Sequence, residues 1–124
     1  MEIIFETTRQ FEKDLASFSQ EDRNRITVNI DRYGRLIANG GSAPAHISPQ
    51  KLPKGTTEYD SSLYVLKPSP RIRVILAIDE DPLFSRKVVT LFRAVKHDDY
   101  NRALRMVAES IHRQLYGGRA ENLS

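Results

Sequence analysis

Cysteine is absent from this chain of 124 residues, and its absence excludes several kinds of chemistry. Without a thiol, the protein has no disulfide, no thiolate zinc site and no cysteine nucleophile. No stretch of apolar residues approaches the length that crosses a membrane. The first residues, MEIIFETTRQF, lack the basic segment and the long apolar segment of a signal peptide. These absences predict a soluble protein of the cytoplasm.

Size and charge set the next limits. The chain has 40% hydrophobic and 28% charged residues, a composition typical of globular proteins, and its length fits one domain. We expect a single domain over residues 1–116 and a frayed tail over 117–124. The net charge of +3 permits a polyanionic partner without requiring one. The cations gather between Lys51 and Lys96, where a local basic surface can form.

Hydrophobic periodicity and turn residues predict the order of helices and strands. A long segment without periodicity, 43–61, follows the second helix, and two prolines in Lys67–Pro70 predict a turn. The expected strands are 2–6, 62–66, 71–78 and 86–94. The expected helices follow capping signals at Thr7, Ser19 and Asp98, and the last runs to about residue 116.

Grouped strands that follow a pair of helices favour an α+β fold over a repeated βαβ fold. The simplest arrangement has the order β-α-α-β-β-β-α. It forms a four-stranded antiparallel sheet with the helices packed on one face.

The strand 71–78, RIRVILAI, places its two arginines together. Because side chains alternate along a strand, Arg71 and Arg73 share one face, opposite a fully apolar face. Two neighbouring cations repel each other unless an anion binds between them. Taken alone, however, this strand fits a solvated sheet face better than an anion site.

The stretch LFRAVKHDDY follows, where the last strand gives way to a helix. Alternation puts Val89, Leu91, Arg93 and Val95 on one face, so Arg93 can join the arginines of the preceding strand. His97 is the side chain here whose ordinary pKa allows proton transfer near neutral pH. Read separately, His97 is a solvated loop histidine, and a tyrosine in a first helical turn is a packing residue.

Together these residue types match one reaction, the metal-free cleavage of RNA. Attack of a 2′-OH on the adjacent phosphorus needs a base, cations that stabilise the added phosphate charge, and an acid for the leaving oxygen. The sequence has no P-loop, no GxGxxG and no GxSxG. Its histidines, His46, His97 and His112, have no paired carboxylate at ligand spacing, so we expect no zinc site and no other cofactor.

The chain resembles the RelE/ParE superfamily of bacterial toxins over residues 1–116. The motifs that carry the resemblance are KLPKG, LYVLKPSPRIRVILAIDED and LFRAVKHDDY. The resemblance implies the toxin of a type II toxin–antitoxin system, a ribosome-dependent endoribonuclease that cleaves translated mRNA without a metal. It also implies a cognate antitoxin, mRNA on the ribosome and a toxin–antitoxin hetero-oligomer as partners, and no membrane.

By the same resemblance, Arg73 looks like the strand arginine that stabilises the phosphate, and Lys67 like the cation that ends the preceding strand. His97 and Tyr100 look like the imidazole and the tyrosine that complete the site. The expected catalytic residues are therefore Lys67, Arg73, His97 and Tyr100. The expected RNA-binding residues are Lys51, Lys54, Arg71, Arg93 and Lys96.

Two alternatives remain open at this level. ParE-like relatives share the fold and act on DNA gyrase, and a chain of this fold can also serve only as a protein-binding module. The last helix is expected to contact core through its stripe of Ala103, Val107, Ile111 and Leu115. It is alternatively an element that the antitoxin displaces.

Overall fold

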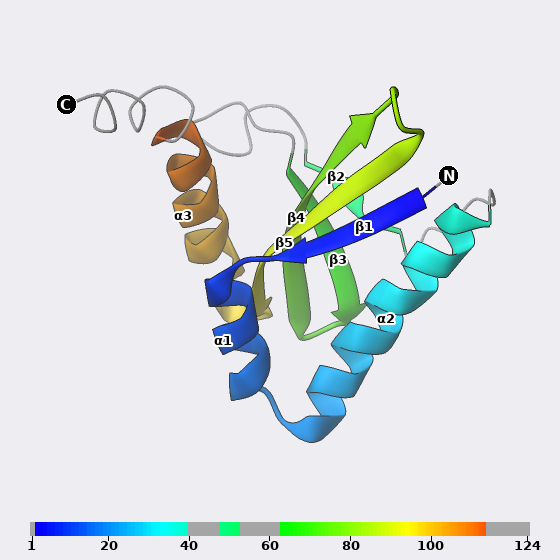
Figure 1. Ribbon diagram of the computed structural model, residues 1–124. Coiled ribbons are helices and arrows are strands. Elements are labelled where there is room, and N and C mark those ends of the chain that lie inside the picture. Colours follow the sequence, from blue (N-terminus) through cyan, green and yellow to red (C-terminus); the bar gives the residue numbers. More distant parts are fainter. Residues whose placement is uncertain (1, 40–47, 53–62, 114–124) are drawn as a thin grey trace.

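The computed structural model describes residues 2–39, 48–52 and 63–113 (Figure 1). Its elements are β1 (Glu2–Thr7), α1 (Arg9–Ser17), α2 (Gln20–Ala38), β2 (Gln50–Lys51), β3 (Leu63–Ser69), β4 (Ile72–Asp81), β5 (Arg86–Lys96), one 3₁₀ turn (His97–Asp99) and α3 (Tyr100–His112). The predicted α+β class and element order are confirmed, with one strand added. The expected frayed tail, 117–124, lies outside the described residues.

The sheet has five strands in the order β1-β5-β4-β3-β2, not the expected four. The added strand, β2, comes from the segment that lacks periodicity, and it pairs through Gln50 with Val65 and through Lys51 with Tyr64. The expectation of a wholly antiparallel sheet is also wrong, because β1 runs parallel to β5. Residue pattern carries little information on the relative direction of strands that are so far apart in the chain.

Helices cover both faces of the sheet, which corrects the expectation that they share one. Along β4, alternate residues enter two separate clusters. Ile72, Val74 and Leu76 pack under α1 and α2, whereas Ile75 packs under α3. Ile75 is completely buried, so the face that also carries Arg73 needs an apolar cover of its own.

Both late strands contain an irregularity that sequence alternation did not predict. In β5, Arg93 and Leu91 pair with consecutive residues of β4, so Phe92 is an extra residue. The bulge reverses the alternation, and Val95 therefore lies on the α3 side while Ala94 lies with Leu91 under α1 and α2. The prediction that Val95 shares a face with Leu91 was wrong for this reason.

In β3 the strand continues through Pro68, the first of the two prolines that predicted a turn, and the turn comes at Pro70. The strand reaches Ser69, and its register shifts between Leu66 and Ser69, the interval that contains Pro68. A proline cannot donate to the ladder, so the pairing is interrupted there without ending the strand. The effect is to carry Lys67 along the sheet instead of into a loop.

The helices begin at local caps. The Ser19 hydroxyl accepts from the backbone N–H of Asp22 at the start of α2, as predicted. At α1 the cap is Thr8, one residue after the predicted Thr7, and its hydroxyl accepts from Phe11. α3 buries Ala103 and Val107 of the predicted stripe, which supports its reading as core. Among the residues described, no helix is long and apolar enough to cross a membrane.

Candidate nucleic-acid interface

The four residues predicted as catalytic, Lys67, Arg73, His97 and Tyr100, lie at one end of the sheet, where β3 and β5 end and β4 and α3 begin. Ile72, near the start of β4, pairs with both Ser69 of β3 and Lys96 of β5. The backbone N–H of His97 donates to the carbonyl of Arg71 at 2.8 Å, which fixes the chain as it leaves β5. Side chains that are distant in sequence therefore meet here without any long loop.

Arg73 is held at this end by the turn that precedes it. Its Nη1 donates to the carbonyl oxygens of Ser69, Pro70 and Ile72, at 3.2, 3.2 and 2.9 Å. These bonds orient the guanidinium but do not neutralise it. No carboxylate forms an ion pair with Arg73 in the described part of the chain, so its charge is available to an anion.

Lys67 and Arg73 line a common surface hollow of about 400 Å³. The exposed Lys67 ammonium has no ion pair among the described residues either. The other residues of the hollow are Ser48, Gln50, Val65, Pro68, Ser69 and Pro70. Two cations beside one concave surface suit a phosphate, and the polar and proline side chains around them suit the sugar or base of a nucleotide.

Tyr100 is half-buried in the first turn of α3, where it packs against the buried cluster on that side of the sheet, which includes Ile75, Val95 and Ala103. Burial raises the pKa of its phenol above the ordinary value, and the nearby charge of Arg73 works in the opposite direction by lowering it. The net direction is upward, so the phenol is protonated at neutral pH. The electrostatic link shows that the tyrosine lies within reach of the Arg73 charge.

His97 lies at the same end but is turned to solvent. Its side chain is 62% exposed, and Nδ1 lies 3.7 Å from the Asp98 carboxylate. The structure therefore brings Lys67 and Arg73 together and puts Tyr100 near Arg73. His97 joins this end of the sheet through backbone bonds: its N–H donates to the Arg71 carbonyl, and its carbonyl accepts from the Tyr100 N–H.

The remaining cations differ in their availability. Three cations are exposed and form no ion pair within the described residues: Lys51 on β2, Arg71 in the turn before β4, and Lys96 at the end of β5. Arg93 is bound to the carboxylate of Asp14, with Nε 2.7 Å from Oδ2. Lys54 lies outside the described residues.

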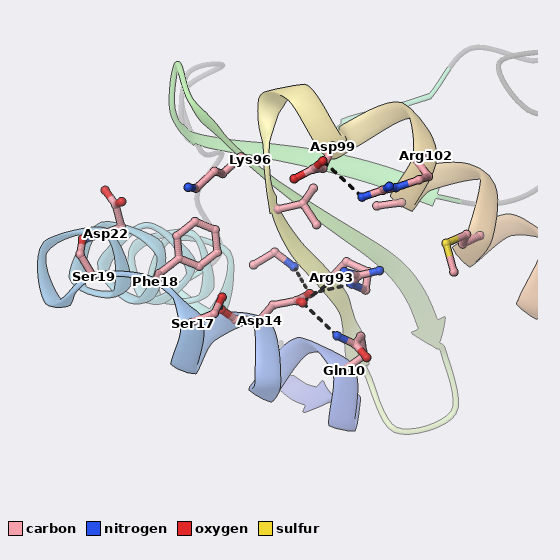
Figure 2. A pocket seen from close by; sticks show the side chains of 14 residues that line it. Gln10, Asp14, Ser17, Phe18, Ser19, Asp22, Arg93, Lys96, Asp99 and Arg102 are labelled. Atoms are coloured by element: carbon pink, nitrogen blue, oxygen red, sulfur yellow. Dashed lines mark hydrogen bonds and ion pairs between the residues drawn. The ribbon is translucent and has the colours of Figure 1, made fainter.

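A second hollow, of about 870 Å³, borders the other edge of β5, between α1 and α3 (Figure 2). Most of its charges are already paired: Asp14 binds Arg93, and Asp99 lies 3.3 Å from Arg102. This balance makes the second hollow a poorer place for a polyanion than the first. Sequence reasoning missed Asp14, although it stands at i+3 from Phe11, on the apolar stripe of its helix.

Comparison with known proteins identifies the fold. No protein-family model matches the chain, and no curated protein does. A histidine-to-glutamine mutant of YafQ from E. coli aligns with a TM-score of 0.54 at 17% identity, over 77% of this chain and 94% of that one. YafQ from E. coli strain BL21(DE3) aligns with a TM-score of 0.52 at 14% identity, over the same shares of the two chains.

A YoeB/ParE toxin from Agrobacterium tumefaciens has a TM-score of 0.49 at 13% identity, over 78% of this chain and 99% of that one. The chain has the RelE/ParE-like toxin fold that its motifs predicted. At these identities the likeness is one of fold, and the chemistry has to be argued from the site.

Proposed function

We propose that this protein is the toxin of a type II toxin–antitoxin pair and an endoribonuclease that cleaves translated mRNA on the ribosome. The observation that carries the proposal is the cation cluster at the end of the sheet. Lys67 and Arg73 line one hollow without an acidic partner among the described residues, and the protonated Tyr100 lies within electrostatic reach. The toxin fold supports the same reading.

The reaction is an attack of a ribose 2′-oxygen on the adjacent phosphorus. The P–O2′ bond forms, the P–O5′ bond breaks, and the products carry a 2′,3′-cyclic phosphate and a free 5′-hydroxyl. The 2′-OH proton passes to a base and the leaving 5′-oxygen takes a proton from an acid. No metal or cofactor takes part in this scheme.

Each residue has a role that follows from its chemistry. The Arg73 guanidinium, fixed by its three carbonyl bonds, stabilises the charge that develops on the phosphate. Lys67 contacts a phosphate oxygen or serves as the base. His97 and Tyr100 share proton transfer and stack on bases. Because the pKa of Tyr100 is raised, its phenol keeps its proton at neutral pH and can supply that proton to the leaving oxygen. Lys51, Arg71 and Lys96 extend the basic surface along the RNA.

A cognate antitoxin is the expected protein partner, in a toxin–antitoxin hetero-oligomer, and the protein acts in the cytoplasm, where ribosomes translate. The same fold would also suit a gyrase-directed toxin or a non-catalytic binding module. Lys67 and Arg73, which have no acidic partner in the part of the chain that the structure describes, favour RNA over both, because neither alternative needs this cluster.

The decisive experiment is induced expression in a bacterial host, followed by primer extension on a reporter mRNA. We expect the wild-type protein to arrest growth and to cut translated mRNA at discrete sites. Arg73→Ala should lower cleavage by about 100- to 1,000-fold, because it removes the group that stabilises the added charge. Arg86→Ala is the matched control, since this arginine lies at the other end of the same strand pair and is bound to Asp81.

The outcomes separate the three functions. Cleavage that is lost in Arg73→Ala and kept in Arg86→Ala supports the nuclease. Growth arrest with intact mRNA would move the assignment to the gyrase-directed toxin. No growth arrest and no cleavage by the wild-type protein would leave the binding module.

A further inference from the structure

Asp14 on α1 is the one charged side chain that is buried among the described residues, at 8% exposure. A buried carboxylate is unfavourable unless hydrogen bonds compensate it. Here Oδ1 accepts from Gln10 Nε2 at 3.1 Å and from Arg93 Nη2 at 3.2 Å. Oδ2 accepts from Arg93 Nε at 2.7 Å and from the Ala94 backbone N–H at 3.0 Å. Both oxygens are therefore fully used.

These bonds lie where β5 has lost its neighbouring strand. β1 ends beside Leu91, but β5 continues to Lys96. Over this interval α1 takes the place of β1 along the strand edge. The Thr8 backbone N–H donates to the Leu91 carbonyl at 3.1 Å, and the Thr8 hydroxyl donates to the Phe92 carbonyl at 2.8 Å. Asp14 then holds the next two residues of β5 (Figure 2).

Arg93 and Ala94, the two residues of β5 that Asp14 binds, immediately precede the candidate site. Val95, the next residue along β5, is the register partner of Arg73. His97 begins the 3₁₀ turn that follows β5, and Tyr100 begins α3 directly after it. The bonds from α1 also lie next to the bulge at Phe92, where the hydrogen-bond ladder between β5 and β4 is interrupted. The end of β5 thus depends on α1 for support at the point where its own pairing is weakest.

We propose that Asp14 is a positioning residue for the candidate site, and that it fixes the end of β5 through Arg93 and the Ala94 amide. The inference rests on the proposed nuclease function. Proton transfer requires groups held within about 0.5 Å of their working geometry. A small rotation at the end of β5 would move Tyr100 away from Arg73 and would displace His97 as well. Arg93 accordingly acts through the strand and not by direct contact with RNA.

The informative variant is Asp14→Asn. It keeps the size of the side chain but replaces one oxygen by an amide that donates. In either orientation, that amide faces two donors, either Gln10 and Arg93 Nη2 or Arg93 Nε and the Ala94 N–H. At least one bond to β5 is lost and replaced by a repulsive contact.

Two controls come from the same hollow. Gln10→Ala removes one of the bonds to Asp14 and leaves the whole connection to β5. Asp22→Asn makes the same chemical change on α2, where the carboxylate forms no ion pair within the described residues and the backbone N–H, not the side chain, binds the Ser19 cap. Neither control should alter the end of β5.

The first measurement is single-turnover cleavage of a reporter mRNA on programmed ribosomes. For Asp14→Asn we expect the rate at saturation to fall by about 10- to 100-fold, because misplacement of reacting groups acts on the chemical step. The half-saturating concentration should stay within about twofold of wild type, because the RNA-binding cations are untouched. Both controls should cleave at the wild-type rate.

The second measurement does not need activity. By NMR, the ring signals of His97 and Tyr100 should shift in Asp14→Asn, and the Ala94 amide should exchange faster with solvent. If the wild-type protein cleaves no RNA, the proposed function fails, while these signals still decide whether Asp14 holds the strand end.

A folded Asp14→Asn protein with the wild-type rate and unshifted rings would overturn the proposal. If that variant does not fold, Arg93→Lys is measured in its place, because lysine keeps the charge but cannot make both bonds to the carboxylate. The same fall in the saturated rate is then expected, and an unchanged rate would again overturn the proposal.

Discussion

The two ends of the β4–β5 strand pair carry positive charge in opposite ways. At the hairpin end, Arg86 Nε lies 3.2 Å from Asp81, and Lys87 Nζ lies 3.6 Å from Glu80, so each cation faces a carboxylate on the opposite strand. At the other end, the cations have no such partner in the part of the chain that the structure describes: Lys67, Arg71, Arg73 and Lys96.

The hairpin end has other features of a purely structural turn. Ser85 has a φ of 50°, in the left-handed region that tight turns use. The Arg86 guanidinium lies over the Phe84 ring, 5.1 Å from its centroid, and Leu83 is 89% exposed. Nothing at this end requires a polyanion, because Arg86 and Lys87 each already lie beside a carboxylate.

The difference teaches where to look for function in a mildly basic protein. Cross-strand ion pairs help to set strand register and contribute little stability. Neighbouring cations without acids produce a local positive potential that suits a phosphate chain. The same two strands therefore provide one end whose cations are paired and one basic end, and only the basic end carries Tyr100 and His97.

The largest further effect should come from the basic end, at Tyr100. Tyr100→Phe keeps the ring that packs against residues on the α3 side of the sheet but removes the hydroxyl that we propose as the proton donor. We expect cleavage to fall by about 100-fold, as is typical when a general acid is removed. Primer extension and single-turnover rates measure this. A Tyr100→Phe protein with the wild-type rate would leave Tyr100 as a packing residue.

The direction of the Tyr100 pKa also predicts pH behaviour. Because burial raises that pKa above the unfolded value near 10.0, the unfolded chain ionises first as pH rises. The stability that Tyr100 contributes is complete below pH 10 and is lost as pH rises through its folded pKa. Raising the pH above 10 should therefore lower the free energy of unfolding of the wild-type protein more than that of Tyr100→Phe, and urea denaturation measures both. Arg73→Ala should raise the pKa of Tyr100 further, which absorbance titration of the phenol can test.

A smaller effect is expected on the salt dependence of RNA binding, where one lysine from each end can be compared. Lys96→Ala should reduce the salt dependence of binding to a single-stranded RNA, lowering the slope of log affinity against log salt by about 0.7. Lys87→Ala should leave the slope unchanged, because Glu80 already neutralises Lys87. Fluorescence titration at several salt concentrations measures both slopes. Equal slopes for the two variants would contradict the contrast between the ends.

The smallest effect belongs to the hairpin end. Asp81→Asn removes the charge of one partly exposed ion pair with Arg86, and it should lower the free energy of unfolding by no more than about 1 kcal/mol. RNA cleavage should not change. Urea denaturation gives the first quantity and the single-turnover rate gives the second. A large loss of cleavage would show that the two ends are coupled.

Local patterns predicted most of the elements. Apolar patterns identified every strand except β2, and the Ser19 cap and the stripe from Phe11 to Phe18 identified the first helices. Strand ends were less well predicted: β5 extends past the expected Ala94 to Lys96, and β3 extends through Pro68. Strand ends depend on whether a neighbouring strand accepts the pairing, which local residue type does not encode.

The candidate site was predicted as a set of residue types and not as a geometry. The sequence predicted a cation cluster around Arg73, which the structure supports by placing Lys67 beside the same hollow. It could not predict that Arg93 forms an ion pair with Asp14, because 79 residues separate the two. Their roles in catalysis and in RNA binding stay predictions for the experiments above.

By itself, the sequence determined the α+β class, the element order and the residues available for chemistry, because these follow from local periodicity, caps and composition. Only the tertiary structure decided the parallel pairing of β1, the helices on both faces and the bulge at Phe92. It also decided which cations are neutralised. These outcomes depend on contacts between distant segments, and such contacts form only where burial and hydrogen bonding of the whole chain are satisfied together.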